Sequence, residues 1–304
     1  MSFLTYHASF RRLAPAQLLK NVMAAEQAGF GAIHVSDPSE KDQREFSFTW
    51  LATALRSTKL PFTVACTPNL RYGLPNIARE MATLGELFPA RFDLAISKTD
   101  DLPENGNNST NQMPPLEETA SFIRKSLSGE YLTYDDGNIQ DKVKVHTPPR
   151  IPTLLFYELS SVNEVKGVAK WADGLIADGD DLDEAEKIVR EWKRYAGASK
   201  PFFIKINFSY GANPEEAVNS ASEVPRDEFI PAQNAGENIP PYSKIENKGK
   251  IKLFTSIADL LQWIEPFKKM EASRIILNNL HDDQEFFINA FGLYHKAYEV
   301  VVPV

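Results

Sequence analysis

Two titratable side chains stand where the sequence predicts that strands end. His7 closes the short apolar run Phe3–His7, and Asp37 follows the β-branched run FGAIHV at residues 30–35. The carboxyl ends of neighbouring parallel strands meet at one face, so we expect the imidazole and the carboxylate to lie close together. A carboxylate keeps an imidazole available as a proton shuttle near neutral pH. The pair predicts acid–base chemistry. The alternatives are a hydrogen-bonded structural histidine and an aspartate that only caps a loop.

Other catalytic chemistries lack their usual sequence motifs. The chain has no HExxH sequence, no cluster of cysteine and histidine, and no GxSxG, Walker or GxGxxG sequence, so we predict no metal site. The single cysteine, Cys66, lies in an apolar run, where cysteine usually packs as a small hydrophobe. We expect His34 in the packed layer around a strand, and His146, His281 and His295 at the surface.

The composition is that of a globular protein and argues against several other classes of protein. The chain has 304 residues, of which 43% are hydrophobic and 11% aromatic, which excludes a disordered or fibrous protein. A net charge of −8 argues against binding to nucleic acid, which requires a basic surface. The chain has one cysteine, no apolar run of the ~20 residues that a membrane span needs, and no signal-peptide pattern. We therefore expect a cytoplasmic protein without a membrane anchor.

Apolar strand patterns alternate with helical patterns almost from end to end. Eight predicted strands end at His7, Val35, Cys66, Ser97, Tyr157, Ala177, Ser209 and Asn278, and a helical segment follows each. This pattern predicts one (β/α)8 (TIM) barrel domain over residues 1–304, with a β-hairpin inserted at Tyr131–His146. Two polar segments, residues 99–115 and 222–250, follow strands. We expect them over the mouth as lids, or as loops without a role.

Several motifs of the chain resemble those of a known family. TYHASFRRLAP, AAEQAGFGAIHVSD, FSFTWL, the pattern TPNLRYGLP and the late ASRIILNN are similar to the bacterial-luciferase-like barrel family, most densely over residues 5–97. The closest branch is that of the deazaflavin-dependent glucose-6-phosphate dehydrogenases. This resemblance implies an oxidoreductase that binds FMN or the deazaflavin coenzyme F420 and transfers a hydride to or from a small molecule. It also implies a homodimer, with helices at residues 46–56 and 74–88 in the interface.

The resemblance also assigns roles to individual positions. In the relatives a histidine follows the aspartate after the second strand, whereas here Pro38 follows Asp37. A GTGE turn after the fourth strand is replaced by Ser97-Lys98-Thr99-Asp100, and a Gly-Gly pair after the fifth strand is replaced around Glu158. With His7 added from its strand-end position, the predicted catalytic residues are His7, Asp37 and Asp100, and the predicted cofactor contacts are Asp37, Val64, Ala65, Ser97, Lys98, Thr99, Tyr157 and Glu158. Because both glycine turns differ, the alternative is a catalytically silent barrel that binds another ligand or no cofactor.

Overall fold

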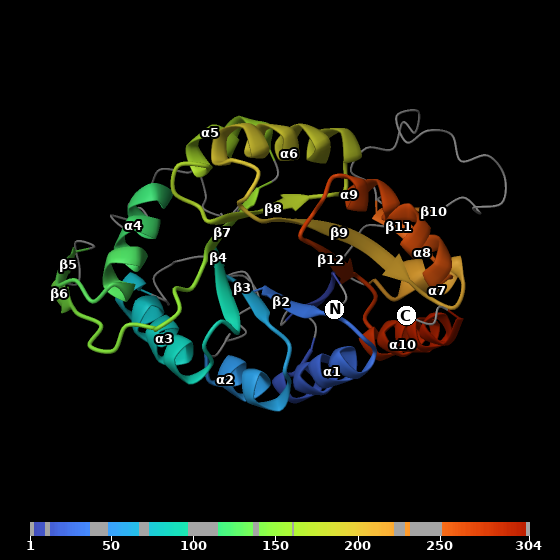
Figure 1. The fold of residues 1–304 in the computed structure, drawn as a ribbon. Coiled ribbons are helices and arrows are strands. Elements are labelled where there is room, and N and C mark those ends of the chain that lie inside the picture. Colours follow the sequence, from blue (N-terminus) through green and yellow to red (C-terminus); the bar gives the residue numbers. More distant parts are fainter. Residues whose placement is uncertain are drawn as a thin grey trace, which may run out of the picture.

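Eight parallel strands close into a barrel (Figure 1). The computed structural model describes residues 3–9, 13–36, 48–66, 73–96, 115–135, 140–159, 161–221, 229–231 and 251–301. The barrel strands, in order around the ring, are β1 (Leu4–Ser9), β2 (Ala32–Ser36), β3 (Phe62–Cys66), β4 (Phe92–Ile96), β7 (Leu155–Leu159), β8 (Gly174–Asp178), β9 (Phe202–Tyr210) and β12 (Arg274–Asn279). Pairing of β8 with β9 and of β12 with β1 closes the ring, which confirms the predicted (β/α)8 barrel.

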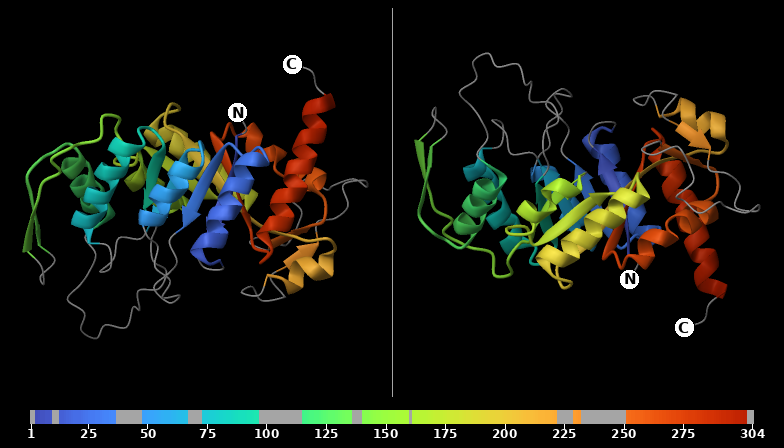
Figure 2. Two further views of the ribbon diagram at one scale, coloured as in Figure 1. Left: turned by 90° about the horizontal axis from the view of Figure 1, so that it is seen from below. Right: turned by 90° about the horizontal axis from the view of Figure 1, so that it is seen from above.

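Helices surround this ring on the outside, as the views in Figures 1 and 2 show. They are α1 (Pro15–Gln27), α2 (Phe48–Ser57), α3 (Leu74–Leu87), α4 (Leu116–Leu127), α5 (Val165–Val168), α6 (Leu182–Ala196), α7 (Pro214–Asn219), α8 (Ile257–Trp263), α9 (Glu265–Lys269) and α10 (Gln284–Val301). Local signals set their ends: α1 starts at a proline and stops before Gly29, whose φ of 96° suits glycine. Within the described ranges, the helices are too short or too polar to span a membrane.

Three segments depart from the simple strand–helix repeat. The hairpin of β5 (Leu132–Asp135) and β6 (Gln140–Val143) confirms the prediction and lies outside α4, where Tyr134 packs against Phe122 (Figure 1). Strands β10 (Phe229–Pro231) and β11 (Ile251–Phe254) extend the sheet from β9. The helical segment predicted after the strand that ends at Tyr157 is a 3₁₀ turn (Val162–Glu164) followed by the single turn α5.

Most of the two segments predicted as lids lies outside the described residues. Only residue 115 and residues 229–231 of them are described, so the structure leaves their role a prediction. The sequence prediction missed β11, α8 and α9. A signal for α8 was present, because the Ser256 hydroxyl accepts a hydrogen bond from the backbone N–H of Asp259, which is the first half of a capping box.

Alternation along the strands divides the core into an outer and an inner apolar layer. Residues such as Val64 and Tyr157 face outward and pack in a large cluster with the helices. The intervening residues face the barrel axis, where six of them form a compact apolar plug: Ala65, Ala95, Phe156, Ile176, Phe203 and Ile276. The plug closes the middle of the barrel and leaves its carboxyl-end mouth to the inward residues that follow it.

Candidate functional site

The inward positions beyond the apolar plug carry polar side chains. Strand alternation places these residues at the carboxyl ends of β1, β2, β7, β8, β9 and β12. We call them the mouth cluster: His7, His34, Ser36, Glu158, Asp178, Lys205, Asn207 and Asn278, together with Asp180 just after β8. Backbone register pairs His7 with His34, Asp178 with Lys205 and Asn207 with Asn278. This is the face at which (β/α)8 barrels carry out their chemistry.

Two histidines of the mouth cluster form a hydrogen-bonded pair. The Nδ1 atoms of His7 and His34 lie 2.8 Å apart, and the two rings are within 26° of parallel. The Nε2 atom of His7 lies 3.2 Å from the Ser36 hydroxyl. Both imidazoles are buried, His34 completely. One edge of the His7 ring is therefore held by His34, and the other is directed at a hydroxyl group.

A buried carboxylate and ammonium complete the other side of this pair. Glu158 Oε1 lies 3.1 Å from His34 Nε2 and 3.5 Å from Lys205 Nζ. The first contact has the distance of an ion pair but lacks good hydrogen-bond alignment. Burial alone would raise the pKa of Glu158, but Lys205 and then His34 outweigh it and hold that pKa below its usual range. Glu158 also raises the pKa of Lys205, against the effect of burial. Glu158 and Lys205 are thus an ionised pair at neutral pH.

A second network fixes the amides on the opposite wall of the mouth. Asp180 accepts hydrogen bonds from the Asn207 backbone N–H at 3.0 Å and from the Asn207 side-chain amide at 2.6 Å. The Asn278 amide in turn donates to Asn207 Oδ1 at 2.6 Å. Burial, followed by the charge of Asp178, raises the pKa of Asp180 to about 7, against the effects of Asn207 and Lys205. The network orients both amides at the mouth and places there a carboxyl group that titrates near neutral pH.

The residues predicted as functional fall into three groups. His7 and Glu158 belong to the mouth cluster, and Ala65 is part of the apolar plug below it. Val64 and Tyr157 point outward, and the Tyr157 hydroxyl donates to Glu164 Oε2 at 3.3 Å. Their side chains therefore do not face the mouth. The strand positions Phe62–Cys66 contain no cis peptide bond. Five of the predicted residues lie outside the described residues: Asp37, Ser97, Lys98, Thr99 and Asp100.

The structure corrects two expectations about histidines. His34 was expected in the packed layer around the strands, but it faces the barrel axis, because its partners His7 and Glu158 both lie inside. His281 was expected at the surface, but only 2% of it is exposed, and its Nδ1 accepts a hydrogen bond from the Asp283 backbone N–H just before α10. His146 is exposed, as predicted.

Sequence reasoning also missed Lys205, Asn207, Asn278, Asp178 and Asp180. A signal for the first two was present in the run FFIKINFSY of β9, where residues 203, 205 and 207 share one face. Among the described residues, no group of three or more histidine, cysteine or acidic side chains is arranged to hold a metal ion.

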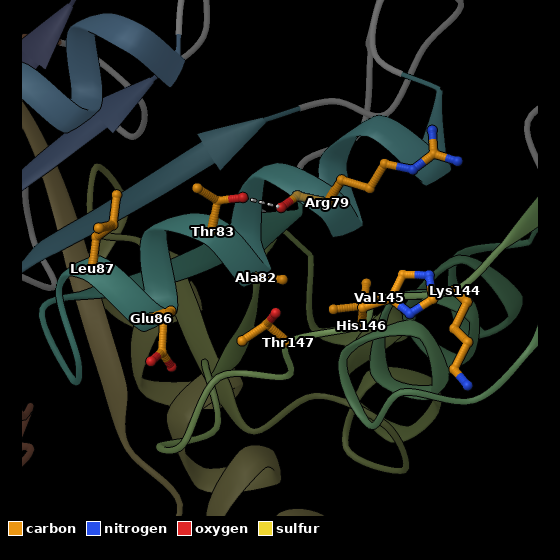
Figure 3. Close-up of a pocket in the computed structure, with 9 residues that line it drawn as sticks. All are labelled: Arg79, Ala82, Thr83, Glu86, Leu87, Lys144, Val145, His146 and Thr147. Carbon is orange, nitrogen blue, oxygen red and sulfur yellow. Dashed lines mark hydrogen bonds between the residues drawn. The ribbon is translucent and has the colours of Figure 1, made fainter.

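A separate hollow of about 470 Å³ lies on the outside of the barrel (Figure 3). It runs between α3 and the segment after β6, and its lining includes Thr83, Leu87 and His146. Leu87 is 63% exposed, and Thr83 and His146 are exposed as well. The polar groups of this hollow are solvated and not arranged around a buried reactive group, so the mouth cluster is the better candidate site.

Fold and site together define a (β/α)8 barrel whose mouth carries a buried set of titratable side chains. Residues 3–262 match the Luciferase-like monooxygenase family, and the chain belongs to that family.

Relatives and solved structures agree with this assignment. The chain is 26% identical over 240 residues to the F420-dependent glucose-6-phosphate dehydrogenase of Mycolicibacterium smegmatis. The matched region covers 71% of each chain. In fold it is similar to an F420-dependent secondary alcohol dehydrogenase in complex with an F420-acetone adduct, with a TM-score of 0.72, 20% identity, and coverage of 95% of this chain and 97% of that one. It is also similar to a type II Baeyer–Villiger monooxygenase from Pseudomonas putida in complex with FMN, with a TM-score of 0.68, 13% identity, and coverage of 99% and 100%.

Proposed function

We propose that this protein is an oxidoreductase that uses a flavin or the deazaflavin F420 and acts on a small molecule. Family membership and the names of the relatives support the reaction class. The observation that carries the proposal for this chain is the mouth cluster, in which the buried His7–His34 pair meets the ionised Glu158 at the catalytic face of the barrel. The names of the relatives leave the substrate and the choice between FMN and F420 open.

The side chains of the mouth fit one part of such a cofactor better than the other. A flavin ring is planar with polar edges, and the mouth offers His7, Ser36 and the Asn278 amide above an apolar floor. The phosphate of the cofactor tail does not fit beside Glu158. That carboxylate stands where the resemblance implies a glycine pair, and a phosphate there would be repelled by ~1 kcal/mol or more. We therefore assign the ring, but not the tail, to the mouth cluster.

Within this proposal the residues of the chain bind, orient and move protons. The cofactor supplies hydride transfer when it is bound. His7 takes up or releases the proton that accompanies the change in the substrate, because its Nε2 faces the mouth and hydrogen-bonds a hydroxyl. The amides of Asn207 and Asn278, held by Asp180, orient polar groups of the ligand. Asp37, Asp100 and the Ser97-Lys98-Thr99 turn stay predicted contacts outside the described residues.

Binding of the two cofactors is the first test. The purified protein is titrated with FMN and with F420, and quenching of their fluorescence is followed up to about 100 µM. We expect one of them to bind, and we expect the bound form to turn over with an alcohol or a carbonyl compound. His7→Asn should retain binding and lose turnover, whereas His146→Asn, an exposed histidine outside the barrel, should retain both.

The competing function is the catalytically silent barrel. The observation that favours it is Glu158, whose ion pair with Lys205 lies where the resemblance implies a phosphate cradle. Binding of neither cofactor would support this reading and contradict the proposed oxidoreductase.

The homodimer is part of the proposal as well, with α2 and α3 in the interface. Its support is the family resemblance together with Leu87 of α3, which is 63% exposed. Light scattering at micromolar concentration should give twice the mass of 34.1 kDa, and a monomeric mass would contradict the dimer. A cytoplasmic location stays a prediction from composition.

A further inference from the structure

Five polar groups form a line of contacts across the mouth of the barrel. The line runs from the Ser36 hydroxyl through His7 and His34 to Glu158 and Lys205. Its successive distances are 3.2, 2.8, 3.1 and 3.5 Å. The residues come from four strands, β1, β2, β7 and β9, so the closure of the barrel brings them together. Each contact restricts where the protons of the next group can be.

The Glu158 end of the line fixes the protons of His34. Glu158 is ionised and can only accept, and a lone pair on the His34 Nε2 that lies 3.1 Å from it would be repelled, so the carboxylate favours a proton on this nitrogen even though the contact is not well aligned for a hydrogen bond. Burial lowers the pKa of His34, against the effect of Glu158, so His34 is neutral and has a single ring proton. Its Nδ1 is therefore a lone pair that faces the Nδ1 of His7.

The tautomer of His7 follows from that of His34. A contact of 2.8 Å between two ring nitrogens requires one proton between them, and since His34 Nδ1 has none, His7 Nδ1 must donate. When His7 is neutral, its Nε2 is then a lone pair. The Ser36 hydroxyl lies 3.2 Å from that atom and donates to it. A hydroxyl group thus already occupies the position from which His7 would accept a substrate proton.

We infer that His34 and Glu158 are positioning residues that hold His7 as the Nδ1–H tautomer, so that its Nε2 accepts a proton from a hydroxyl group of the substrate. This inference rests on the proposed function and adds to it two positioning residues and the tautomer of the base. The O–H bond of the substrate breaks, its proton binds to Nε2, and the Nδ1–H bond to His34 stays intact. The positive charge that forms on His7 is stabilised by Glu158 through His34, and the reverse reaction returns the proton.

Charges on the surrounding strands act on protonated His7 in opposite directions, some stabilising it and some destabilising it. His34 of β2 contacts the His7 ring directly, and Glu158 of β7 lies behind it. Lys205 of β9 is paired with Glu158, and Asp178 of β8 acts on Lys205. Removal of the charge of Glu158 alone should therefore leave the Lys205 cation less compensated and make protonated His7 less stable.

Nitrogen-15 NMR of the histidine rings, recorded without any cofactor, tests the arrangement directly. We expect His34 to be the Nε2–H tautomer and His7 the Nδ1–H tautomer at alkaline pH. In Glu158→Gln we expect a mixture of His7 tautomers and a titration of His7 at lower pH. The matched control is Glu164→Gln, which changes an acid that accepts a hydrogen bond from the outward-facing Tyr157 hydroxyl, and it should change neither signal. An Nε2–H tautomer of His7, or equal effects of the two variants, would overturn the inference.

Kinetics with bound cofactor separate this inference from the proposed function. For an alcohol substrate, Glu158→Gln should lower kcat by about 10- to 100-fold with little change in KM, and the pH at which activity appears should fall. If Glu158→Gln does not fold, the charge-neutral double variant Glu158→Gln/Lys205→Met tests the tautomers and kcat in the same way, without the expected shift of the pH profile. If the predicted tautomers are found but neither cofactor binds, the proposed oxidoreductase is refuted and the positioning of His7 by His34 and Glu158 stands. If the protein is active but lacks these tautomers, the positioning is refuted and the oxidoreductase stands.

Discussion

Removal of the Lys205 ammonium should destabilise the barrel more than removal of any surface cation. The substitution Lys205→Met retains the length of the side chain and deletes the charge 3.5 Å from Glu158 Oε1. Two opposite charges at 3.5 Å attract by about 5 kcal/mol at an effective dielectric constant of ~20. Because 24% of Lys205 and 16% of Glu158 are exposed, screening reduces this to about 2–3 kcal/mol. The buried carboxylate left behind adds to the loss, so we expect a total of about 3–4 kcal/mol.

Urea unfolding of a double-mutant cycle measures this interaction. Lys205→Met, Glu158→Gln and their combination should show a coupling free energy of about 2 kcal/mol at pH 7. In Lys205→Met, burial should raise the pKa of Glu158 above its unfolded value. Stability from that group is then present below the unfolded pKa and lost as pH rises, so the deficit should be larger at pH 8 than at pH 5. In the control pair Lys193–Glu271 the charged atoms lie 2.8 Å apart but 81% of Glu271 is exposed, so its cycle should show a much smaller coupling. Additive effects of the Lys205 and Glu158 substitutions would refute the argument.

Three further predictions concern stability elsewhere in the chain. Burial raises the pKa of Asp93 to about 6, so its contribution is complete below its unfolded pKa near 4 and is lost as pH rises through 6. Asp93→Asn should remove about 1–2 kcal/mol of this pH dependence in urea titrations at pH 4 to 8. Asp181 accepts hydrogen bonds from the backbone N–H groups of Asp183 and Glu184, so Asp181→Ala should cost about 1 kcal/mol, measured by urea unfolding. An added Cβ at Gly167 of α5 meets nothing within 4 Å, whereas at Gly85 it would lie 2.7 Å from Pro149 Cβ. In thermal unfolding, Gly167→Ala should stabilise by about 0.5–1 kcal/mol and Gly85→Ala should destabilise by about 1–3 kcal/mol.

The fold was predictable because the spacing of hydrophobic residues along the sequence indicates whether a segment is a strand or a helix. Runs such as FFIKINFSY have the alternation of a strand, and the segment at Leu182–Tyr195 has a helical period, which the structure confirms as Leu182–Ala196. The prediction failed where the elements are short. Strand β11 has four residues, and α9 has five, too few to establish a period against the polar sequence before them.

The candidate site was predictable only in part, because a site depends on which strands become neighbours. His7 was identified by its place at a strand end, and Glu158 by comparison with the family. His34 was assigned to the wrong layer, since sequence alternation gives two faces but does not say which is the inside of the barrel. Its contact with Glu158 joins β2 to β7, two strands that are not neighbours in the ring. Only the closed barrel shows that contact.

The charges of the mouth cluster are difficult to explain by stability alone. A buried ion pair such as Glu158–Lys205 can often be replaced by apolar side chains without loss of stability, because desolvation of both charges offsets their attraction. The apolar plug directly below, from Ala65 to Ile276, shows that inward positions of this barrel pack well without polar atoms. The change from plug to charged cluster occurs along single strands, between Phe203 and Lys205 on β9 and between Phe156 and Glu158 on β7. It occurs at the end of the barrel where ligands bind. Such a change is expected of a barrel that accepts a cost in stability to hold an imidazole in one tautomer at its mouth.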